Sequence, residues 1–182
     1  DIVVHSTTKF LSGHGNAMGG AIVDSGTFDW AQNDKYPSLA QPEEAYHGLN
    51  FYESFGDLAY TTYGHAVGLR DLGPTMAPMN AYLTIMGIET LALRMEKHVA
   101  NAEVVANYLH NHAKVSWVSY AGLEVSNYFH LAKKYLPKGA GSVFTFGIKG
   151  GYDAGVKFVE KCQLLSHLAN ICLLYTSDAA DD

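Results

Sequence analysis

The sequence begins with DIVVHSTTKFLSGHG (residues 1–15), and this stretch, together with GGAIVDSG (residues 19–26), decides the fold. Ile2–Val4 and Ala21–Val23 are short β-branched runs bounded by polar residues, which predicts two buried strands. Two buried strands this close, separated by glycines, suggest the interior sheet of an α/β domain. The glycines of residues 13–20 are spaced too irregularly for a nucleotide-binding fingerprint, so we interpret them as a structural loop.

Chemically useful side chains follow the first predicted strand directly. Ser6, Thr8 and Lys9 lie where α/β sheets carry active-site groups, at the carboxyl end of a strand. The Lys9 amine suits a Schiff base with a phosphorylated aldehyde cofactor, and the hydroxyls of Ser6 and Thr8 could bind its phosphate. From spacing alone, a solvated lysine beside a hydroxyl-closed turn is the more common arrangement, because most lysines lie on protein surfaces.

The same residues also match the S-x-x-K motif of penicillin-binding proteins, with Ser6 as nucleophile and Lys9 as its partner. That motif normally opens a helix, but glycines arrive at positions 13 and 15. No S-D-N follows, and Lys149-Gly150-Gly151 matches K-T-G only in half. The S-x-x-K motif is therefore matched only in part.

Composition excludes several classes of protein. The 182 residues are 48% hydrophobic and 16% charged, which is globular and too apolar for intrinsic disorder. The formal charge of −6 and the absence of basic runs give no reason to expect nucleic acid as a partner. The most apolar stretch, 164–175, is interrupted by polar residues and too short to span a membrane. Cys162 and Cys172 cannot frame a disulfide-built fold, so we expect a reducing cytoplasm. None of the nine histidines falls in a zinc pattern, and we expect no metal site.

The middle of the chain contrasts an irregular segment with a strongly periodic one. Residues 27–76 hold many aromatics without clean periodicity, which indicates loops and short helices. From Pro78 to about His112, apolar residues recur at spacings of three and four, which predicts one long helix with Gly87 as its only weak point. A helix of this length often bridges two lobes.

An α+β pattern follows, and it predicts a lobe boundary near residues 112–115. We expect a strand at 115–120, a short helix at 129–136 and a second strand at 143–148. Asp153 is the candidate cap of a last helix that runs to about Asn170.

Several stretches together resemble one known family. Residues 1–15 resemble the cofactor-lysine segment of the Cys/Met-metabolism family of pyridoxal-phosphate enzymes. The resemblance continues, in the family's order, to about residue 171 through GGAIVDSG (19–26), RDLG (70–73), GIETLALR (87–94), NA (101–102), LAKKYLP (131–137) and FTFGIKGG (144–151). The aromatic segment from His47 to Tyr63 resembles the O-acetylhomoserine sulfhydrylase branch of that family more than the cystathionine-processing branch.

The resemblance implies a fold and a site. Lys9 corresponds to the lysine that carries pyridoxal 5'-phosphate, and Ser6 and Thr8 to hydroxyl residues that contact the phosphate. The implied fold is α/β, a fragment of a type I aminotransferase-like enzyme. Residues 1–112 would end the large cofactor-binding domain and 113–171 would begin the small C-terminal domain. Residues 172–182 depart from the family pattern, resemble translated sequencing adapter and are expected to add nothing to the fold.

The implied reaction joins O-acetyl-L-homoserine and sulfide to give L-homocysteine and acetate, in a cytoplasmic homotetramer. Methionine γ-lyase and cystathionine γ-synthase of the same family are the alternatives, because they share the early chemistry. The family's pyridine-nitrogen aspartate, stacking tyrosine, glycine-rich phosphate loop and substrate-carboxylate arginine have no counterpart in these residues. An inactive remnant or interaction fragment is therefore the alternative from another class, and we expect the 182 residues alone to be inactive.

Overall fold

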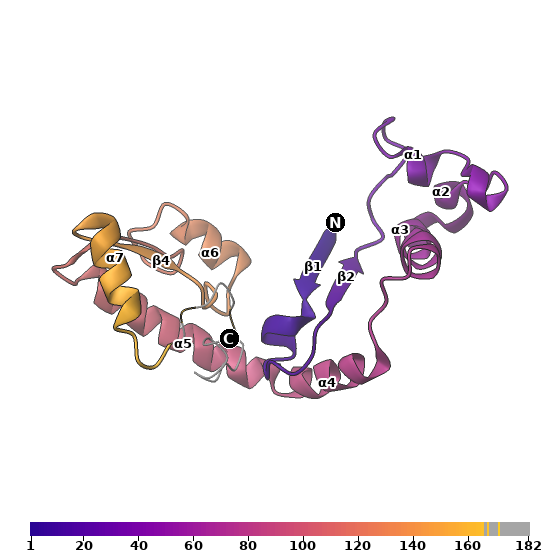
Figure 1. Ribbon diagram of the computed structural model, residues 1–182. Helices are drawn as coiled ribbons and strands as arrows, with labels where there is room; N and C mark the ends of the chain where they lie inside the picture. Colours follow the sequence, from indigo (N-terminus) through magenta and orange to yellow (C-terminus); the bar gives the residue numbers. More distant parts are fainter. Residues whose placement is uncertain (166, 168–170, 172–182) are drawn as a thin grey trace. The chain divides into compact units, whose positions relative to one another are not determined.

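The computed structural model describes residues 1–165, 167 and 171 (Figure 1). The chain divides into two compact units. Unit 1 contains residues 1–8 and 16–84, and unit 2 contains residues 9–15 and the described residues from 85 onward. The domains predicted from the sequence, 1–112 and 113–171, stay a prediction.

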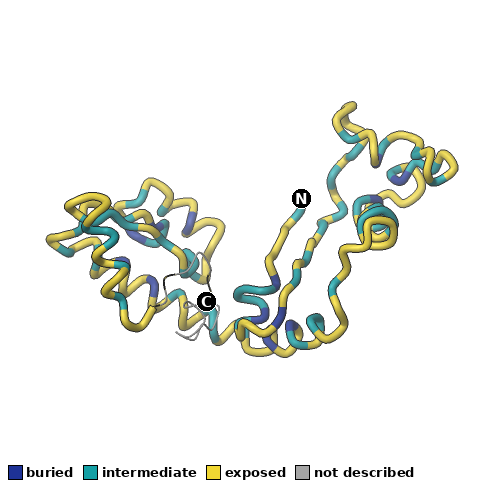
Figure 2. The backbone as a smooth tube through the Cα atoms, in the orientation of Figure 1, coloured by how far each residue is buried: buried dark blue, intermediate teal, exposed yellow. Residues whose placement is uncertain are grey.

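The first sheet in unit 1 is an antiparallel pair, β1 (Ile2–Ser6) and β2 (Gly20–Asp24), in which Ile2 lies opposite Asp24. Both predicted strands form, but the expectation that they are buried in an interior sheet is wrong, because Val3 is 52% exposed and Val4 70% exposed. The backbone that follows the N-terminus is coloured mostly as exposed (Figure 2). The reason is that the described residues give this sheet only two strands, and such a ribbon has no layer that covers its faces.

Short helices fill the remainder of unit 1 up to residue 71, as the irregular sequence pattern predicts. Aromatic rings pack them together: Phe51 is 1% exposed, and the Trp30 ring stacks on the Tyr60 ring with centroids 5.4 Å apart. The helical segments are α1 (Pro37–Ala40), η2 (Glu44–Tyr46), α2 (Phe51–Phe55), η3 (Gly56–Leu58), α3 (Ala59–Tyr63) and η4 (Gly64–Asp71).

The long helix predicted over 78–112 is two helices, α4 (Pro78–Glu89) and α5 (Leu91–His110). They are separated at Thr90, whose backbone (φ −103°, ψ 3°) leaves the helical range. The Thr90 hydroxyl donates to the Gly87 carbonyl at 3.4 Å, so a side chain of the break itself satisfies the end of the first helix. The prediction located the helix but missed this interruption, which comes three residues after the suspected weak point.

Unit 2 contains the second antiparallel pair, β3 (Val115–Ser119) and β4 (Thr145–Ile148), with α6 (Phe129–Tyr135) between them in sequence. These three elements form where they were predicted. Their core includes Tyr120 and Leu123, each 3% exposed, and two alanines of α5, Ala102 and Ala106. Both alanines are buried and belong to the same hydrophobic cluster as Tyr120 and Leu123.

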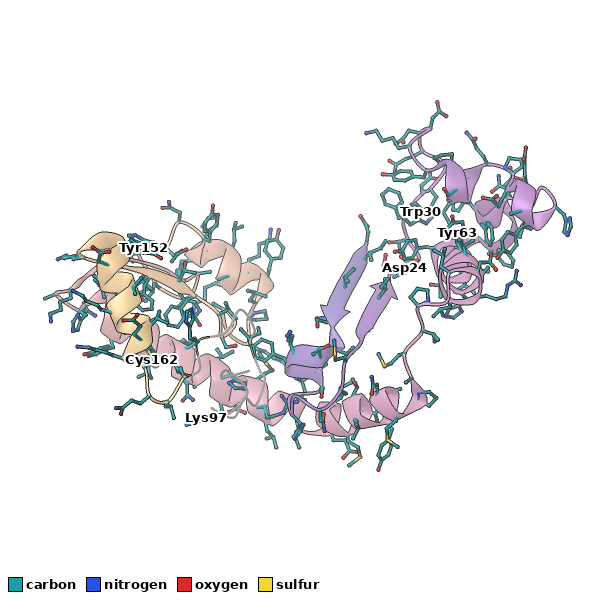
Figure 3. The ribbon with its side chains drawn as sticks, viewed as in Figure 1. Asp24, Trp30, Tyr63, Lys97, Tyr152 and Cys162 are labelled. Atoms are coloured by element: carbon teal, nitrogen blue, oxygen red, sulfur yellow. The ribbon has the colours of Figure 1, made fainter. Side chains whose placement is uncertain are left out.

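The last described helix, α7 (Gly151–Glu160), corrects two predictions. Gly150, with a left-handed φ of 104°, precedes the helix, whereas Asp153 lies inside the first turn, where its carboxylate faces the positive end of the helix dipole. The helix ends at Glu160 instead of near Asn170, and Asn170 lies outside the described residues. Cys162 follows the helix (Figure 3) as a free thiol 3.4 Å from the Phe158 carbonyl. The expectation for residues 172–182 also falls outside the described residues.

Candidate active site

The three predicted site residues lie at the end of β1 and just beyond it. Ser6 is the last residue of β1, opposite Gly20, and its side chain is exposed. Thr8 and Lys9 are half-buried and belong to η1 (Thr7–Leu11), a short irregular helical segment that the Lys9 backbone (φ −92°, ψ −120°) interrupts. The division between the units runs between Thr8 and Lys9, so each side is described by itself.

On the unit 1 side, Gly19 anchors the two threonines that precede Lys9. The Thr7 amide donates to the Gly19 carbonyl at 2.9 Å. The Thr8 hydroxyl oxygen accepts the Gly19 amide at 3.1 Å and lies 3.4 Å from the Gly19 carbonyl. The Thr7 hydroxyl is buried and has no hydrogen-bond partner among the described residues. Thr8 therefore ties the end of β1 to the start of β2, while the neighbouring buried hydroxyl keeps an unused hydrogen-bonding capacity.

On the unit 2 side, one arginine of α5 binds the backbone that follows Lys9. The Arg94 guanidinium donates to the carbonyl of Phe10 at 2.9 Å and of Leu11 at 3.4 Å, and to the Gly87 carbonyl at 2.7 Å. The Lys9 carbonyl accepts the Gly13 amide at 2.7 Å. Sequence reasoning did not single out Arg94, although a lone arginine in the apolar pattern of GIETLALR was a signal that could have identified it.

A second polar cluster links η2 to the end of η4. The Tyr46 hydroxyl donates to the Asp71 carboxylate at 2.6 Å and accepts from the Arg70 guanidinium at 3.2 Å. The hydrogen bond from Tyr46, followed by the one from Arg70, lowers the pKa of the Asp71 carboxyl. The hydrogen bond to Asp71 raises the pKa of the Tyr46 phenol. This cluster involves the RDLG stretch and joins local segments of unit 1; it contains none of the predicted site residues.

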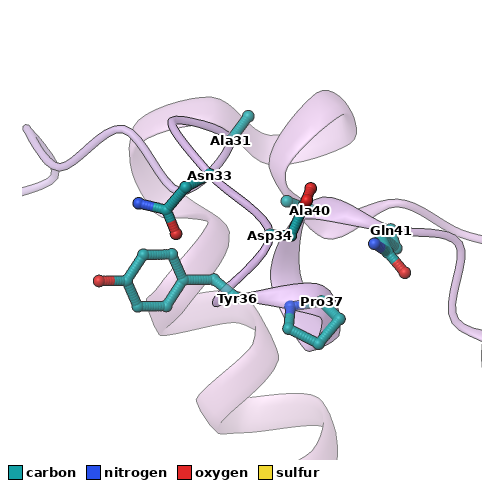
Figure 4. Close-up of a pocket in the computed structure, with 7 residues that line it drawn as sticks. All are labelled: Ala31, Asn33, Asp34, Tyr36, Pro37, Ala40 and Gln41. Carbon is teal, nitrogen blue, oxygen red and sulfur yellow. The ribbon is translucent and has the colours of Figure 1, made fainter.

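The pocket in Figure 4 lies elsewhere in unit 1 and is lined only by residues between 31 and 41. Its volume of about 80 Å³ is well below the several hundred Å³ that ligand sites usually offer. Neither Lys9 nor its neighbours line it. Among the described residues, no group of His, Cys, Asp and Glu side chains could hold a metal ion. The described helices include none that is long and apolar enough to cross a membrane.

Comparison with known proteins shows which protein family the chain belongs to. The model of the family of Cys/Met metabolism PLP-dependent enzymes matches residues 1–174, and the chain belongs to this family. The S-x-x-K interpretation of Ser6 and Lys9 gains no support from this family, whose enzymes are PLP-dependent.

The relatives within the family point to one branch of it. The chain is 51% identical over 172 residues to a homocysteine synthase of Schizosaccharomyces pombe. The aligned region covers 94% of this chain and 40% of that relative. It is 46% identical to an O-acetyl-L-homoserine sulfhydrylase of Leptospira meyeri, with the same two coverages. The chain thus spans about two fifths of the length of these relatives.

Solved structures that resemble the chain come from the same kind of enzyme as these relatives. The chain matches a Campylobacter jejuni protein assigned as an O-acetylhomoserine (thiol)-lyase with a TM-score of 0.80 and 38% identity, over 94% of this chain and 43% of that one. That crystal structure contains N'-pyridoxyl-lysine-5'-monophosphate. A cystathionine γ-synthase from Xanthomonas oryzae matches with a TM-score of 0.66 and 26% identity, over 95% of this chain and 36% of that one. The chain therefore matches part of the fold of these PLP-dependent enzymes, as the resemblance implied.

Proposed function

We propose that the full-length protein carrying this chain is a PLP-dependent transferase that converts O-acetyl-L-homoserine and sulfide into L-homocysteine and acetate. The observation that supports this most is the identity of 46–51% to proteins named for this chemistry, over nearly the whole chain. Because those relatives are more than twice as long, the activity is proposed for the complete protein and not for these 182 residues.

The residues around Lys9 fit the cofactor. An exposed hydroxyl at Ser6, a half-buried hydroxyl at Thr8 and the amine of Lys9 lie within four consecutive residues, and the buried Thr7 hydroxyl has an unused donor. Ser6 and Thr8 would hold the phosphate, and Lys9 would carry the cofactor covalently. The cofactor, when bound, supplies an electron sink that stabilises negative charge on the substrate carbons.

Lys9 has a second role in this proposal. With the substrate amine held by the cofactor, the Lys9 Nζ atom would lie tethered beside the substrate. We infer that Nζ removes the proton from Cα and returns protons during the exchange of acetate for sulfide at Cγ. The bond between Cγ and the acetate oxygen breaks, acetate leaves, and a carbon–sulfur bond forms at the same carbon.

The alternatives within the family are less well supported. Identity to the cystathionine γ-synthase structure is 26%, against 44–51% to the homocysteine synthase and to two bacterial O-acetyl-L-homoserine sulfhydrylases. We also expect the complete protein to be cytoplasmic and to form a homotetramer, and sedimentation of the purified protein would test the homotetramer.

The direct test is to identify the lysine that binds the cofactor. Borohydride reduction of the full-length protein with pyridoxal phosphate, followed by peptide mapping, should place the label on Lys9. The Lys9→Ala variant should lose the label and the release of homocysteine from O-acetylhomoserine and sulfide. A label on Lys35 or Lys149 instead would contradict the assignment of Lys9.

A second measurement distinguishes a truncated enzyme from an inactive remnant. We expect the isolated 182-residue chain to release homocysteine no faster than free pyridoxal phosphate does, whereas the full-length protein should turn over many times faster. Turnover by the short chain well above that background, and abolished by Lys9→Ala, would show that these residues suffice.

A further inference from the structure

We propose that Arg94 is a positioning residue that fixes the backbone directly after Lys9 and thereby the base of the Lys9 side chain. This inference rests on the proposed function of Lys9. All the contacts that support it lie within unit 2, in the segment 9–15 and in α4 and α5.

The first observation is the number of backbone atoms that one guanidinium holds. Arg94 Nη1 donates to Phe10 O at 2.9 Å, and Nη2 lies 3.4 Å from Leu11 O and 2.7 Å from Gly87 O. Its Nε donates to the Thr90 hydroxyl at 3.2 Å. A planar guanidinium offers five N–H donors in a fixed fork. It can therefore bind the segment after Lys9 and the Gly87 carbonyl at the same time, which a lysine ammonium cannot do with the same geometry.

The second observation is that two glycines make room for this arrangement. Gly13 has a left-handed φ of 72°, and a Cβ atom there would collide with the Arg94 guanidinium. A Cβ atom at Gly87 would collide with the Ser12 carbonyl. The segment after Lys9 therefore lies directly against the end of α4, with the guanidinium inserted beside it.

The third observation concerns charge. Within the described residues, every hydrogen-bond partner of the Arg94 side chain is a carbonyl or the Thr90 hydroxyl, and the single salt bridge of the described chain belongs to Arg70 and Asp71. A half-buried cation that binds neutral carbonyls, two of them one and two residues after the cofactor lysine, acts as a backbone clamp.

Arg94 should therefore affect the position of the Lys9 amine. Displacing a catalytic group by about 1 Å commonly lowers turnover on the order of a hundredfold. Loss of Arg94 should therefore lower kcat while KM changes little, because Arg94 contacts the lysine segment and no substrate-binding residue of the proposal.

The experiment compares Arg94→Lys and Arg94→Met in the full-length protein. Arg70→Lys is the matched control, because Arg70 is the other arginine of the chain and is exposed. The first readout is hydrogen exchange of the Gly13 amide in cofactor-free protein, because that amide is bonded to the Lys9 carbonyl. The second is the rate at which pyridoxal phosphate and borohydride label Lys9. The melting temperature of each variant is recorded alongside.

We expect Gly13 exchange to be about tenfold faster or more in Arg94→Met, and labelling of Lys9 to be slower, with Arg94→Lys intermediate and Arg70→Lys like the wild type. Exchange and labelling equal to the wild type in Arg94→Met would overturn the inference, even if the melting temperature falls. A wild-type protein labelled on another lysine would instead overturn the proposed function, and Gly13 exchange would still test the clamp.

Discussion

Gly87 of α4 packs against the backbone carbonyl of Ser12, so closely that a Cβ atom at position 87 would overlap the carbonyl oxygen. Ser12 itself is completely buried. This contact joins a helix to the segment that follows Lys9 and explains a glycine in the middle of an otherwise apolar helical pattern. The sequence marked Gly87 as a weak point of a helix, whereas the structure gives it a packing role.

The Gly87→Ala substitution should therefore destabilise the full-length protein, although alanine is the better helix former. The overlap involves backbone that cannot rotate away, and overpacking of this kind costs about 1–3 kcal/mol, more than the roughly 1 kcal/mol that alanine gains in a helix. Urea denaturation measures the free energy of unfolding. Gly155→Ala in α7 is the control, because nothing lies near that position and stability should stay the same or rise. A Gly87→Ala protein as stable as Gly155→Ala would show that the backbone at Ser12 shifts to accommodate the added Cβ atom without cost.

A second prediction concerns the Thr8 hydroxyl, which accepts the Gly19 amide. Thr8→Val keeps the shape but removes the acceptor, so the full-length protein should lose about 1 kcal/mol of stability and bind pyridoxal phosphate more weakly. Thr8→Ser should retain most of both. Cofactor titration and urea denaturation measure the two effects, and the exposed Thr145→Val change in β4 is the control. Unchanged cofactor affinity in Thr8→Val would remove Thr8 from the phosphate site.

A third prediction follows from the lowered pKa of Asp71, which the hydrogen bond from Tyr46 causes first. A carboxyl whose folded-state pKa is lowered stabilises the protein above its ordinary pKa of about 3.9, and this stabilisation is lost as the pH falls through the lowered value. Tyr46→Phe should melt below the wild type at pH 7, and the difference should shrink as the pH falls below about 4. A difference that stays constant from pH 7 to pH 3 would mean that Asp71 does not depend on Tyr46.

Local patterns predicted most of the elements. The β-branched runs in β1 and β2, the helical spacing of α4 and α5 and the alternation in β4 all describe the local chain, and these elements form near the predicted bounds. Burial was predicted badly for Val3 and Val4, because burial depends on neighbouring layers that local sequence does not reveal. The break at Thr90 was missed for a similar reason, since it is tied to side-chain bonds with Gly87 and Arg94.

In the candidate site, too, some residues could be predicted from the local sequence and one could not. Ser6, Thr8 and Lys9 are contiguous, so their pattern was visible in one short stretch, and the family resemblance gave them roles. Arg94 is 85 positions from Lys9 in the sequence, and its bonds go to backbone carbonyls, which carry no residue-specific signal. Only the folded arrangement of the segment 9–13 against α4 and α5 shows what this arginine holds.

The last prediction tests the core of unit 2 through Tyr120. Its ring is 3% exposed and contacts the Phe144 ring, and its hydroxyl donates to the Gly141 carbonyl at 2.9 Å. Burial, with a smaller contribution from Glu103, raises the pKa of the Tyr120 phenol. Tyr120→Phe keeps the ring but leaves the carbonyl without this donor, so we expect a loss of about 1 kcal/mol in urea denaturation at pH 7.

The pH dependence of the same variant separates the hydrogen bond from simple packing. A tyrosine with a raised folded-state pKa stabilises the protein fully below its ordinary pKa of about 10, and this stabilisation is lost as the pH rises through the raised value. The wild type should therefore lose its advantage over Tyr120→Phe as the pH rises above about 10, because the phenol ionises in the unfolded chain before it ionises in the folded one. Tyr152→Phe is the matched control, because Tyr152 is 85% exposed (Figure 3) and its change should leave stability at pH 7 unaltered. If Tyr120→Phe and Tyr152→Phe unfold alike at pH 7 and at pH 11, the bond to Gly141 contributes nothing to the fold of unit 2.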